Sequence, residues 1–330
     1  MEIFEEFKAE FPRIEKEVPL KNYTTFRIGG LARYFLRTSD KKELKKIIGL
    51  VVKKNINFCI MGGGSNVLFP SDGFDGLVIV YKVENLAKEK LSIEKTKIKG
   101  DEYIIKADTT VPLSFLISEL KDFSGLEWGV GIPGTLGGAI NGNSGAFGGS
   151  ISDSIESVSA LEVKNGEVSE RTFKKNECSF GYRTSIFKDN RNLIVVSAEL
   201  KLFKGDEKEI QERVRENLEK RKGKHPKGFS AGSVFKNYAG RLEDSLTESF
   251  PQLKVFNEKG VIPAGLLIEL CGLKGKQVGD AKISEDHANF IVNLGNASSE
   301  DVLELIELVK KSVKEKFSID LKEEIQIFCP

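Results

Sequence analysis

The sequence predicts a protein of two domains that both mix helices with strands, and three observations carry this prediction. Helix-period apolar stripes alternate with short apolar runs through the first third of the 330-residue chain. A turn signal at Asn165–Gly166 between two strand-like segments predicts a β-hairpin. The charged segment 206–223 predicts a helix that joins this series of elements to a second one. The expected domains are 1–205, with lobes of roughly 1–82 and 83–205, and 206–330.

The first third predicts a helix, four strands and the start of a second helix. Residues 40–55 form the first helix, with Ser39 or Asp40 as its N-cap. A second helix should begin near Val111 and Pro112, because proline is tolerated in the first turn. The apolar stripe of the first helix comprises Leu44, Ile47, Ile48, Val51 and Val52. Strands are expected at 56–61, 76–82, 91–100 and 102–108.

The rest of the chain also mixes predicted helices with predicted strands. Strands are expected at 191–203, 289–295 and 319–328, and helices at 263–275 and 298–317. The helix at 298–317 carries one apolar stripe on the core side. That stripe consists of Val302, Leu305, Ile306, Val309 and Val313.

Composition excludes several classes of partner. Lys plus Arg is 50 and Asp plus Glu is 49, so there is no overall basic field to hold nucleic acid. No apolar run approaches the ~18–20 residues needed to span a bilayer, and residues 1–11 lack the pattern of a signal peptide. We therefore expect a cytoplasmic monomer that acts on small molecules, with no nucleic-acid or membrane partner.

The four cysteines lie far apart and form no CxxC pair. Such spacing disfavours a zinc site or a redox dithiol and suits reduced thiols in a cytoplasm. No second histidine stands at metal-ligand spacing from His287, so no metal site is expected. The cysteines are Cys59, Cys178, Cys271 and Cys329.

Two glycine-rich stretches are candidates for ligand-binding backbone. Residues 62–66 read GGGSN after a predicted strand, where consecutive glycines can turn N–H groups toward an anion such as a pyrophosphate. A merely tight turn is an equally good interpretation of that stretch alone. Residues 129–149 hold nine glycines in 21 positions, a density expected where backbone approaches a bound group closely. The formal GxGxxG at 129–134 lacks the strand and helix of a Rossmann motif. Two cradles some 70 residues apart suggest one dinucleotide-sized ligand.

Chemically active side chains stand in four further places. Arg183, after Tyr182, could clamp a carboxylate or phosphate, or form a structural ion pair. Ser233, in SAGSVFKN, is either an ordinary loop hydroxyl or a proton donor. Basic residues crowd positions 221–227 just before it, as expected for an anionic substrate or a solvated helix end. Glu323 and Glu324 occupy a predicted strand, so one of the two should point inward.

Seven segments together resemble the UDP-N-acetylenolpyruvoylglucosamine reductase family in its shorter, type II form. They run in family order over almost the whole chain and include TTFRIGG, MGGGSNVLF, GYRTS and SAGSVFKN. The seven segments are 24–30, 61–69, 129–148, 180–188, 224–237, 263–293 and 323–327.

The resemblance implies an α+β fold: an FAD-binding domain of the vanillyl-alcohol oxidase (PCMH) type, followed by an α+β substrate-binding domain. It implies noncovalent FAD, with NADPH as hydride donor; the sequence itself carries no separate nicotinamide fingerprint. The implied cofactor-binding residues are Gly62, Gly63, Gly64, Ser65, Asn66, Gly131, Pro133, Gly134, Thr135, Gly138, Asn143, Gly145 and Ala146.

The implied reaction reduces UDP-N-acetylglucosamine enolpyruvate to UDP-N-acetylmuramate for peptidoglycan, and so serves the cell wall, cell shape and cell division. The catalytic residues would be Arg183, Ser233 as proton donor, and Glu324. Tyr182, Lys224 and Asn237 match positions that hold the substrate's diphosphate and sugar.

The chain departs from the family pattern in several places. Residues 142–148 read GNSGAFG where MNAGAYG is common, so that Phe147 replaces a tyrosine. Leu267 replaces a common tryptophan and Gln326 a common arginine, and the chain ends Phe328-Cys329-Pro330 where glycine often follows the last strand. An alternative is an FAD-dependent oxidase or dehydrogenase of a hydroxy acid on the same scaffold. The SAGSVFKN and EEIQI segments disfavour it, and a requirement for NADPH would exclude it. A nucleotide-binding module without chemistry is disfavoured by Arg183, Ser233 and the C-terminal glutamate.

Overall fold

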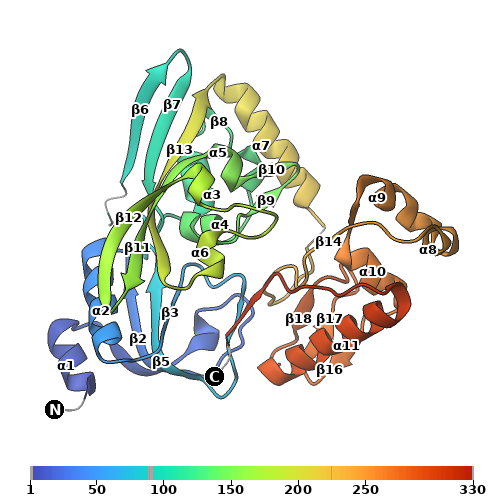
Figure 1. Ribbon diagram of the computed structural model, residues 1–330, viewed down its shortest axis with the longest axis horizontal. Helices are drawn as coiled ribbons and strands as arrows, with labels where there is room; N and C mark the ends of the chain where they lie inside the picture. Colours follow the sequence, from blue (N-terminus) through green and yellow to red (C-terminus); the bar gives the residue numbers. More distant parts are fainter. Residues whose placement is uncertain (1–2, 88, 90–91, 224, 329–330) are drawn as a thin grey trace. The chain divides into compact units, whose positions relative to one another are not determined.

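A computed structural model describes residues 3–87, 89, 92–223 and 225–328 (Figure 1). The chain divides into two compact units, which we call the first and the second unit. The first unit comprises residues 1–18, 32–63 and 75–222, and the second comprises 19–31, 64–74 and 223–330. In this division residues 206–222 belong to the first unit, and residues 19–31 and 64–74 belong to the second. The boundary near 205 between two functional domains remains a prediction. Among the described residues no helix is long and apolar enough to cross a membrane.

The first unit contains two main sheets with helices packed against them, together with the two-stranded β9–β10 pair (Figure 1). One sheet has the strand order β1-β2-β5-β3, and the other has the order β12-β11-β13-β7-β6, with β8 also paired to β13. Its helices and strands are α1 (Ile3–Glu10), β1 (Glu15–Pro19), β2 (Leu31–Thr38), α2 (Lys41–Lys53), β3 (Phe58–Met61), β5 (Phe74–Tyr81), β6 (Ile93–Lys99), β7 (Glu102–Asp108), α3 (Leu113–Glu119), β8 (Phe123–Ser124), η2 (Glu127–Gly129), α4 (Leu136–Asn141), β9 (Gly145–Ala146), β10 (Gly149–Ser150), α5 (Ile151–Ser154), β11 (Ile155–Lys164), β12 (Glu167–Lys174), η3 (Lys175–Glu177), α6 (Ile186–Asp189), β13 (Leu193–Lys204) and α7 (Glu207–Arg221).

Helix α2 forms as predicted. Asp40 is the N-cap, and its carboxylate accepts hydrogen bonds from the N–H groups of Lys42 and Glu43. Four of the five stripe residues are buried, and Val52 is half-buried at the edge. The helix therefore presents its apolar face to a core shared with α1 and both sheets.

Strand β13 is buried on both faces, which explains its continuous apolar run. Ile194 and Val196 face the core around α2, while Leu193 and Val195 face a second core under α3 and α4. The predicted hairpin is confirmed: β11 and β12 pair antiparallel around Asn165–Gly166, and both turn residues have positive φ.

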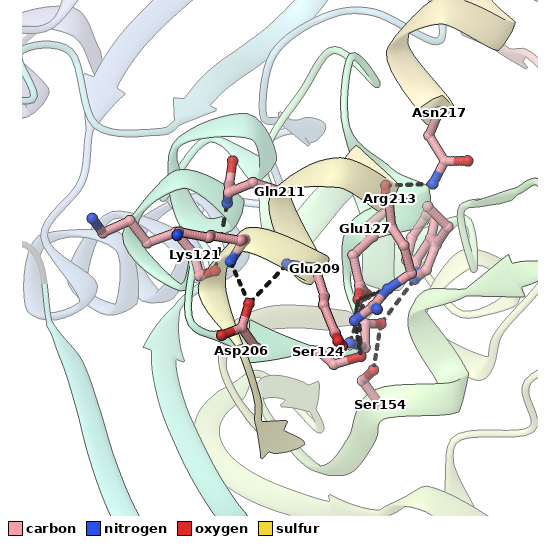
Figure 2. A network of polar contacts seen from close by, with 12 residues as sticks. Lys121, Ser124, Glu127, Ser154, Asp206, Glu209, Gln211, Arg213 and Asn217 are labelled. Carbon is pink, nitrogen blue, oxygen red and sulfur yellow. Dashed lines mark hydrogen bonds and ion pairs between the residues drawn. The ribbon is translucent and has the colours of Figure 1, made fainter. Parts of the chain in front are cut away.

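Helix α7 is anchored on the first unit by a polar network (Figure 2). Arg213 donates from Nε to Glu127 Oε1 at 3.0 Å, and Asn217 Nδ2 donates to the Glu127 carbonyl at 3.1 Å. Asp206 caps the helix by accepting from the N–H groups of Lys208 and Glu209. The segment predicted to join two domains thus packs as part of the first unit.

The second unit combines C-terminal helices with small sheets. Its sheets are β14-β15, β16-β17-β18 and the parallel pair β19-β4. Its helices and strands are η1 (Leu20–Asn22), β4 (Val67–Leu68), β14 (Tyr238–Ala239), α8 (Asp244–Ser249), η4 (Pro251–Leu253), α9 (Lys254–Lys259), β15 (Val261–Ile262), α10 (Ala264–Leu270), β16 (Gln277–Val278), β17 (Ala281–Ile283), β18 (Ile291–Asn293), α11 (Ser299–Phe317) and β19 (Gln326–Ile327).

The predicted helix at the C-terminal end is confirmed, whereas the strand after it is shorter than expected. All five predicted stripe residues of α11 are buried, and Ser298 with Asp301 forms a capping box. The strand expected over 319–328 is reduced to β19, because β4 offers it only two residues to pair with. A single bridge from Glu323 to Phe235 adds to that pairing.

Candidate active site

The two glycine-rich stretches meet inside the first unit. A Cβ on Gly63 would lie 2.8 Å from the Cα of Gly134, and a Cβ on Gly62 would collide with Thr135 Oγ1. Neither position can carry a side chain without moving backbone or a buried threonine. The predicted cradles are therefore in direct contact, as one shared ligand requires.

The rest of the GGGSN turn belongs to the second unit. Gly64 has φ +62°, and its carbonyl accepts from the Thr25 N–H at 3.0 Å. Asn66 Nδ2 donates to the Glu324 carbonyl at 3.2 Å, and the Asn66 carbonyl accepts from the Gln326 N–H at 2.9 Å. Ser65, between them, is half-buried. The turn thus lies beside the C-terminal glutamate within that unit.

The 129–148 stretch folds around a short helix. Thr135 caps α4 by accepting from the Gly138 N–H at 3.2 Å. Gly131 and Gly134 have positive φ, and Gly131, Pro133 and Gly138 are exposed. Exposed backbone in these conformations is available to a ligand.

Arg183 binds the same stretch. Its Nη2 donates to the Gly145 carbonyl at 2.6 Å and its Nη1 to the Asn143 carbonyl at 3.4 Å. In return Asn143 Nδ2 donates to the Gly181 carbonyl at 2.8 Å. Arg183 and Asn143 both hold left-handed backbone, with φ of +55° and +43°. Such strained non-glycine residues cluster at functional sites.

Tyr182 and Ala146 flank these contacts. Tyr182 is half exposed, and its ring lies 5.4 Å from the Arg183 guanidinium carbon. Ala146 pairs with Gly149 in the small β9–β10 ladder. The structure therefore gathers Arg183 with three predicted cofactor-binding residues in the first unit.

In the second unit, Ser233 lies next to the Glu324 segment. Ser233 bridges to Phe290, and the Glu324 N–H donates at 2.7 Å to the carbonyl of Val234, which follows Ser233. Thr25 Oγ1 donates at 2.7 Å to the Ser230 carbonyl on the same loop. Residues 90 positions apart in sequence are thus adjacent through main-chain hydrogen bonds.

The two neighbouring glutamates have different surroundings. Glu323 Oε1 forms an ion pair with Lys310 of α11 at 3.1 Å. Glu324 is half-buried, and its N–H donates to the carbonyl of Val234, which follows Ser233.

The predicted substrate-binding residues are not all described. Asn237 accepts at 3.2 Å from the Ala264 N–H at the start of α10. Lys224 lies outside the described residues. Both histidines lie near the Ser233 loop: His225 and His287 contact the Phe290 ring at 5.3 and 4.9 Å. Burial, and then the charge of His225, lowers the pKa of His287.

Sequence reasoning missed Arg221, which it treated only as part of a basic run. Arg221 ends α7, its guanidinium carbon lies 5.0 Å from the Phe147 ring, and its stem packs against Gly131. Burial, and then the charge of Arg183, lowers the pKa of Arg221. Only its tertiary contacts with Trp128 and Phe147 distinguish it from the neighbouring basic residues, so the sequence offered no signal.

Two family models match the chain. Residues 32–171 match an FAD binding domain, and residues 224–328 match the C-terminal domain of UDP-N-acetylenolpyruvoylglucosamine reductase. The chain is 35% identical over 315 residues to the UDP-N-acetylenolpyruvoylglucosamine reductase of Clostridium novyi, which covers 95% of this chain and 92% of that protein. It is 37% identical over 318 residues to that of Carboxydothermus hydrogenoformans, with 96% and 94% covered.

The chain belongs to the UDP-N-acetylenolpyruvoylglucosamine reductase family. The crystal structure of the Thermus caldophilus member superposes with a TM-score of 0.71 at 31% identity, covering 96% of this chain and 99% of that one. The predicted fold class is confirmed: an FAD-binding domain of the vanillyl-alcohol oxidase type followed by the family's C-terminal α+β domain.

The chain is a flavin-dependent oxidoreductase of this family, with FAD as its cofactor. The residues present fit that cofactor in two respects. The contacting glycines of the first unit leave no room for Cβ atoms, and the guanidinium of Arg221 offers a positive charge at Phe147 in the second stretch. Within the described part of the chain, no three His, Cys, Asp or Glu side chains could hold a metal ion.

Proposed function

We propose that this protein reduces UDP-N-acetylglucosamine enolpyruvate to UDP-N-acetylmuramate with NADPH, a step of peptidoglycan synthesis. The observation that carries the proposal is the adjacency of Ser233 and Glu324 in the C-terminal domain that defines the family. When bound, FAD would pass a hydride from NADPH to the terminal carbon of the enolpyruvyl group. A reaction that draws on NADPH and forms a wall precursor belongs in the cytoplasm and serves cell shape and division.

Residues of the two glycine-rich stretches would hold FAD noncovalently. Backbone N–H groups in left-handed turns can converge on phosphate oxygens, which is the role we assign to these turns. The residues are Gly62, Gly63, Gly64, Ser65 and Asn66 from the first stretch, and Gly131, Pro133, Gly134, Thr135, Gly138, Asn143, Gly145 and Ala146 from the second.

Arg183 and Glu324 would stabilise the charge that develops on the substrate. Hydride addition at the terminal carbon leaves negative charge on the adjacent carbon and its carboxylate. Arg183 can meet the carboxylate with its planar fork, and Glu324 can donate a hydrogen bond if protonated. The two hydrogen bonds that Arg183 makes to backbone carbonyls fix its guanidinium in advance.

Ser233 would then donate a proton to the adjacent carbon. A serine hydroxyl is a weak acid in water, but an enolate-like carbon is strongly basic, so placement matters more than a matched pKa. Ser233 needs no histidine partner because it gives a proton and does not attack. Tyr182, Asn237 and Lys224 would hold the diphosphate and sugar.

Product analysis tests the function directly. FAD-loaded protein, incubated anaerobically with NADPH and enolpyruvyl-UDP-N-acetylglucosamine, should form UDP-N-acetylmuramate, detected by mass spectrometry. Without NADPH no product should form. Oxygen consumption with a hydroxy acid, and no product from the enolpyruvyl substrate, would favour the oxidase alternative.

A further inference from the structure

Helix α7 positions Arg221 beside the glycine-rich stretch at residues 129–149. The Glu127 network anchors α7 on the first unit (Figure 2). Arg221 is the last residue of that helix. Arg221 Nη2 donates to the Trp128 carbonyl at 3.5 Å, directly before the stretch begins. A Cβ on Gly131 would lie 3.1 Å from the Arg221 Cδ, so glycine there makes room for the arginine stem.

The Nε of Arg221 is a buried donor with no acceptor. Among the described residues it is the one buried side-chain nitrogen or oxygen without a hydrogen-bond partner. A buried donor that has no acceptor destabilises the structure, and more so when the group is charged. A bound group that supplies an acceptor would remove this cost.

The charges around Arg221 also favour an anion. No carboxylate of the described residues forms an ion pair with it, and the charge of Arg183 acts on it unfavourably. The guanidinium instead lies over the apolar ring of Phe147, which cannot neutralise it. Two arginines beside one glycine-rich cradle therefore define a cationic site.

We propose that Arg221 is a second cationic residue of the FAD site, and that it pairs with the negative charge of the reduced flavin ring. The proposal rests on the proposed function, in which Arg183 acts beside the reacting atoms. Arg183 donates to the Gly145 carbonyl, and Arg221 lies over the ring of Phe147 two residues later in the same stretch, so we place Arg221 at the ring end of the cofactor. Fixed positive charge placed near a flavin ring stabilises its reduced form.

The test compares the two-electron midpoint potential of bound FAD in four proteins. These are the wild type, Arg221→Met, Arg221→Lys and the control Arg215→Met. Arg215 lies on the same helix, is exposed and pairs with Glu212, so its loss removes a charge away from the site. Photoreduction against a reference dye gives the potential without NADPH or substrate, and flavin fluorescence gives FAD affinity.

Arg221→Met should shift the equilibrium between oxidised and reduced FAD at least tenfold toward the oxidised form, relative to the wild type. The two-electron midpoint potential should therefore fall by at least about 30 mV. Arg221→Lys, which keeps the charge without the Nε donor, should lie between, and Arg215→Met should match the wild type. If Arg221→Met fails to fold, the Lys variant carries the test.

An unchanged potential in every Arg221 variant that holds FAD would overturn the inference. Weaker FAD binding with an unchanged potential would also overturn it, because that result places Arg221 at the diphosphate. A wild-type protein that holds no FAD after reconstitution would instead refute the proposed function.

Discussion

At the scale of single residues, the account depends on Ser233 as a proton donor. Ser233→Ala should leave reduction of the flavin by NADPH nearly intact and slow its reoxidation by the enolpyruvyl substrate by ~10²–10⁴-fold, the usual contribution of a general acid. Anaerobic stopped-flow absorbance of each half-reaction measures both rates. Equal loss in the two half-reactions would remove the acid role.

The two C-terminal glutamates give a matched pair of variants. Glu324→Gln should lower the rate of flavin reoxidation by substrate by ~10²–10³-fold, because it removes the carboxyl group proposed to stabilise the charge that develops on the substrate. Glu323→Gln removes only the ion pair with Lys310 and should leave that rate nearly unchanged. The reverse ranking of the two variants would transfer the role to Glu323.

Gly63 is the residue at which the contact of the two cradles can be tested. Gly63→Ala places a Cβ 2.8 Å from the Gly134 Cα, so backbone must move. FAD affinity should fall at least about tenfold, or 1.4 kcal/mol, measured by quenching of flavin fluorescence.

Gly49→Ala is the control for that variant. Gly49 lies in α2 with nothing within 4 Å of its Cβ position. Alanine there should stabilise the helix by about 0.5–1 kcal/mol without changing FAD affinity. Equal affinities in both variants would mean that the contact does not shape the site.

At the scale of elements, Glu127 fixes helix α7 and gives stability a pH dependence. Burial alone would raise the pKa of Glu127, but hydrogen bonds from backbone N–H groups, Ser124 and Arg213 lower it overall. A carboxyl whose pKa is depressed in the folded state contributes stability above its unfolded pKa. That contribution is lost as the pH falls through the folded value.

Glu127→Gln should therefore lower the free energy of unfolding by about 1–3 kcal/mol at pH 7, as expected for hydrogen bonds to a charged group. The difference from wild type should shrink as the pH falls below the ordinary glutamate pKa of about 4.3. Urea denaturation at pH 7 and pH 4 measures it. Glu212→Gln, which removes the exposed ion pair with Arg215 on the same helix, should change the free energy of unfolding little. A difference independent of pH would contradict this origin.

Elements with strong local signals were predictable from the sequence, and those that depend on partners were not. The stripes of α2 and α11, the Asp40 cap and the Asn165–Gly166 turn are local features. The short β19 was not predictable, because its length depends on pairing with β4 more than 250 residues earlier. Arg221 was missed for the same reason, since only its tertiary contacts with Trp128 and Phe147 single it out.

At the scale of the whole molecule, family membership and site chemistry agree. The alignments with the relatives cover more than nine-tenths of this chain, and the chain itself matches an FAD-binding and a C-terminal family model. Phe147 departs from the family tyrosine, but its ring packs under Arg221, so the position retains an aromatic contact. Leu267 is fully buried in the core of the second unit, which explains why an apolar residue is accepted there.

The visible spectrum of the purified protein tests the central claim most directly. We predict a flavin band, present on purification or after FAD is added, that bleaches with NADPH under anaerobic conditions. The band should return when enolpyruvyl-UDP-N-acetylglucosamine is added, because the substrate reoxidises the flavin. A protein that takes up no FAD, or a bleached band that this substrate cannot restore, would contradict the account.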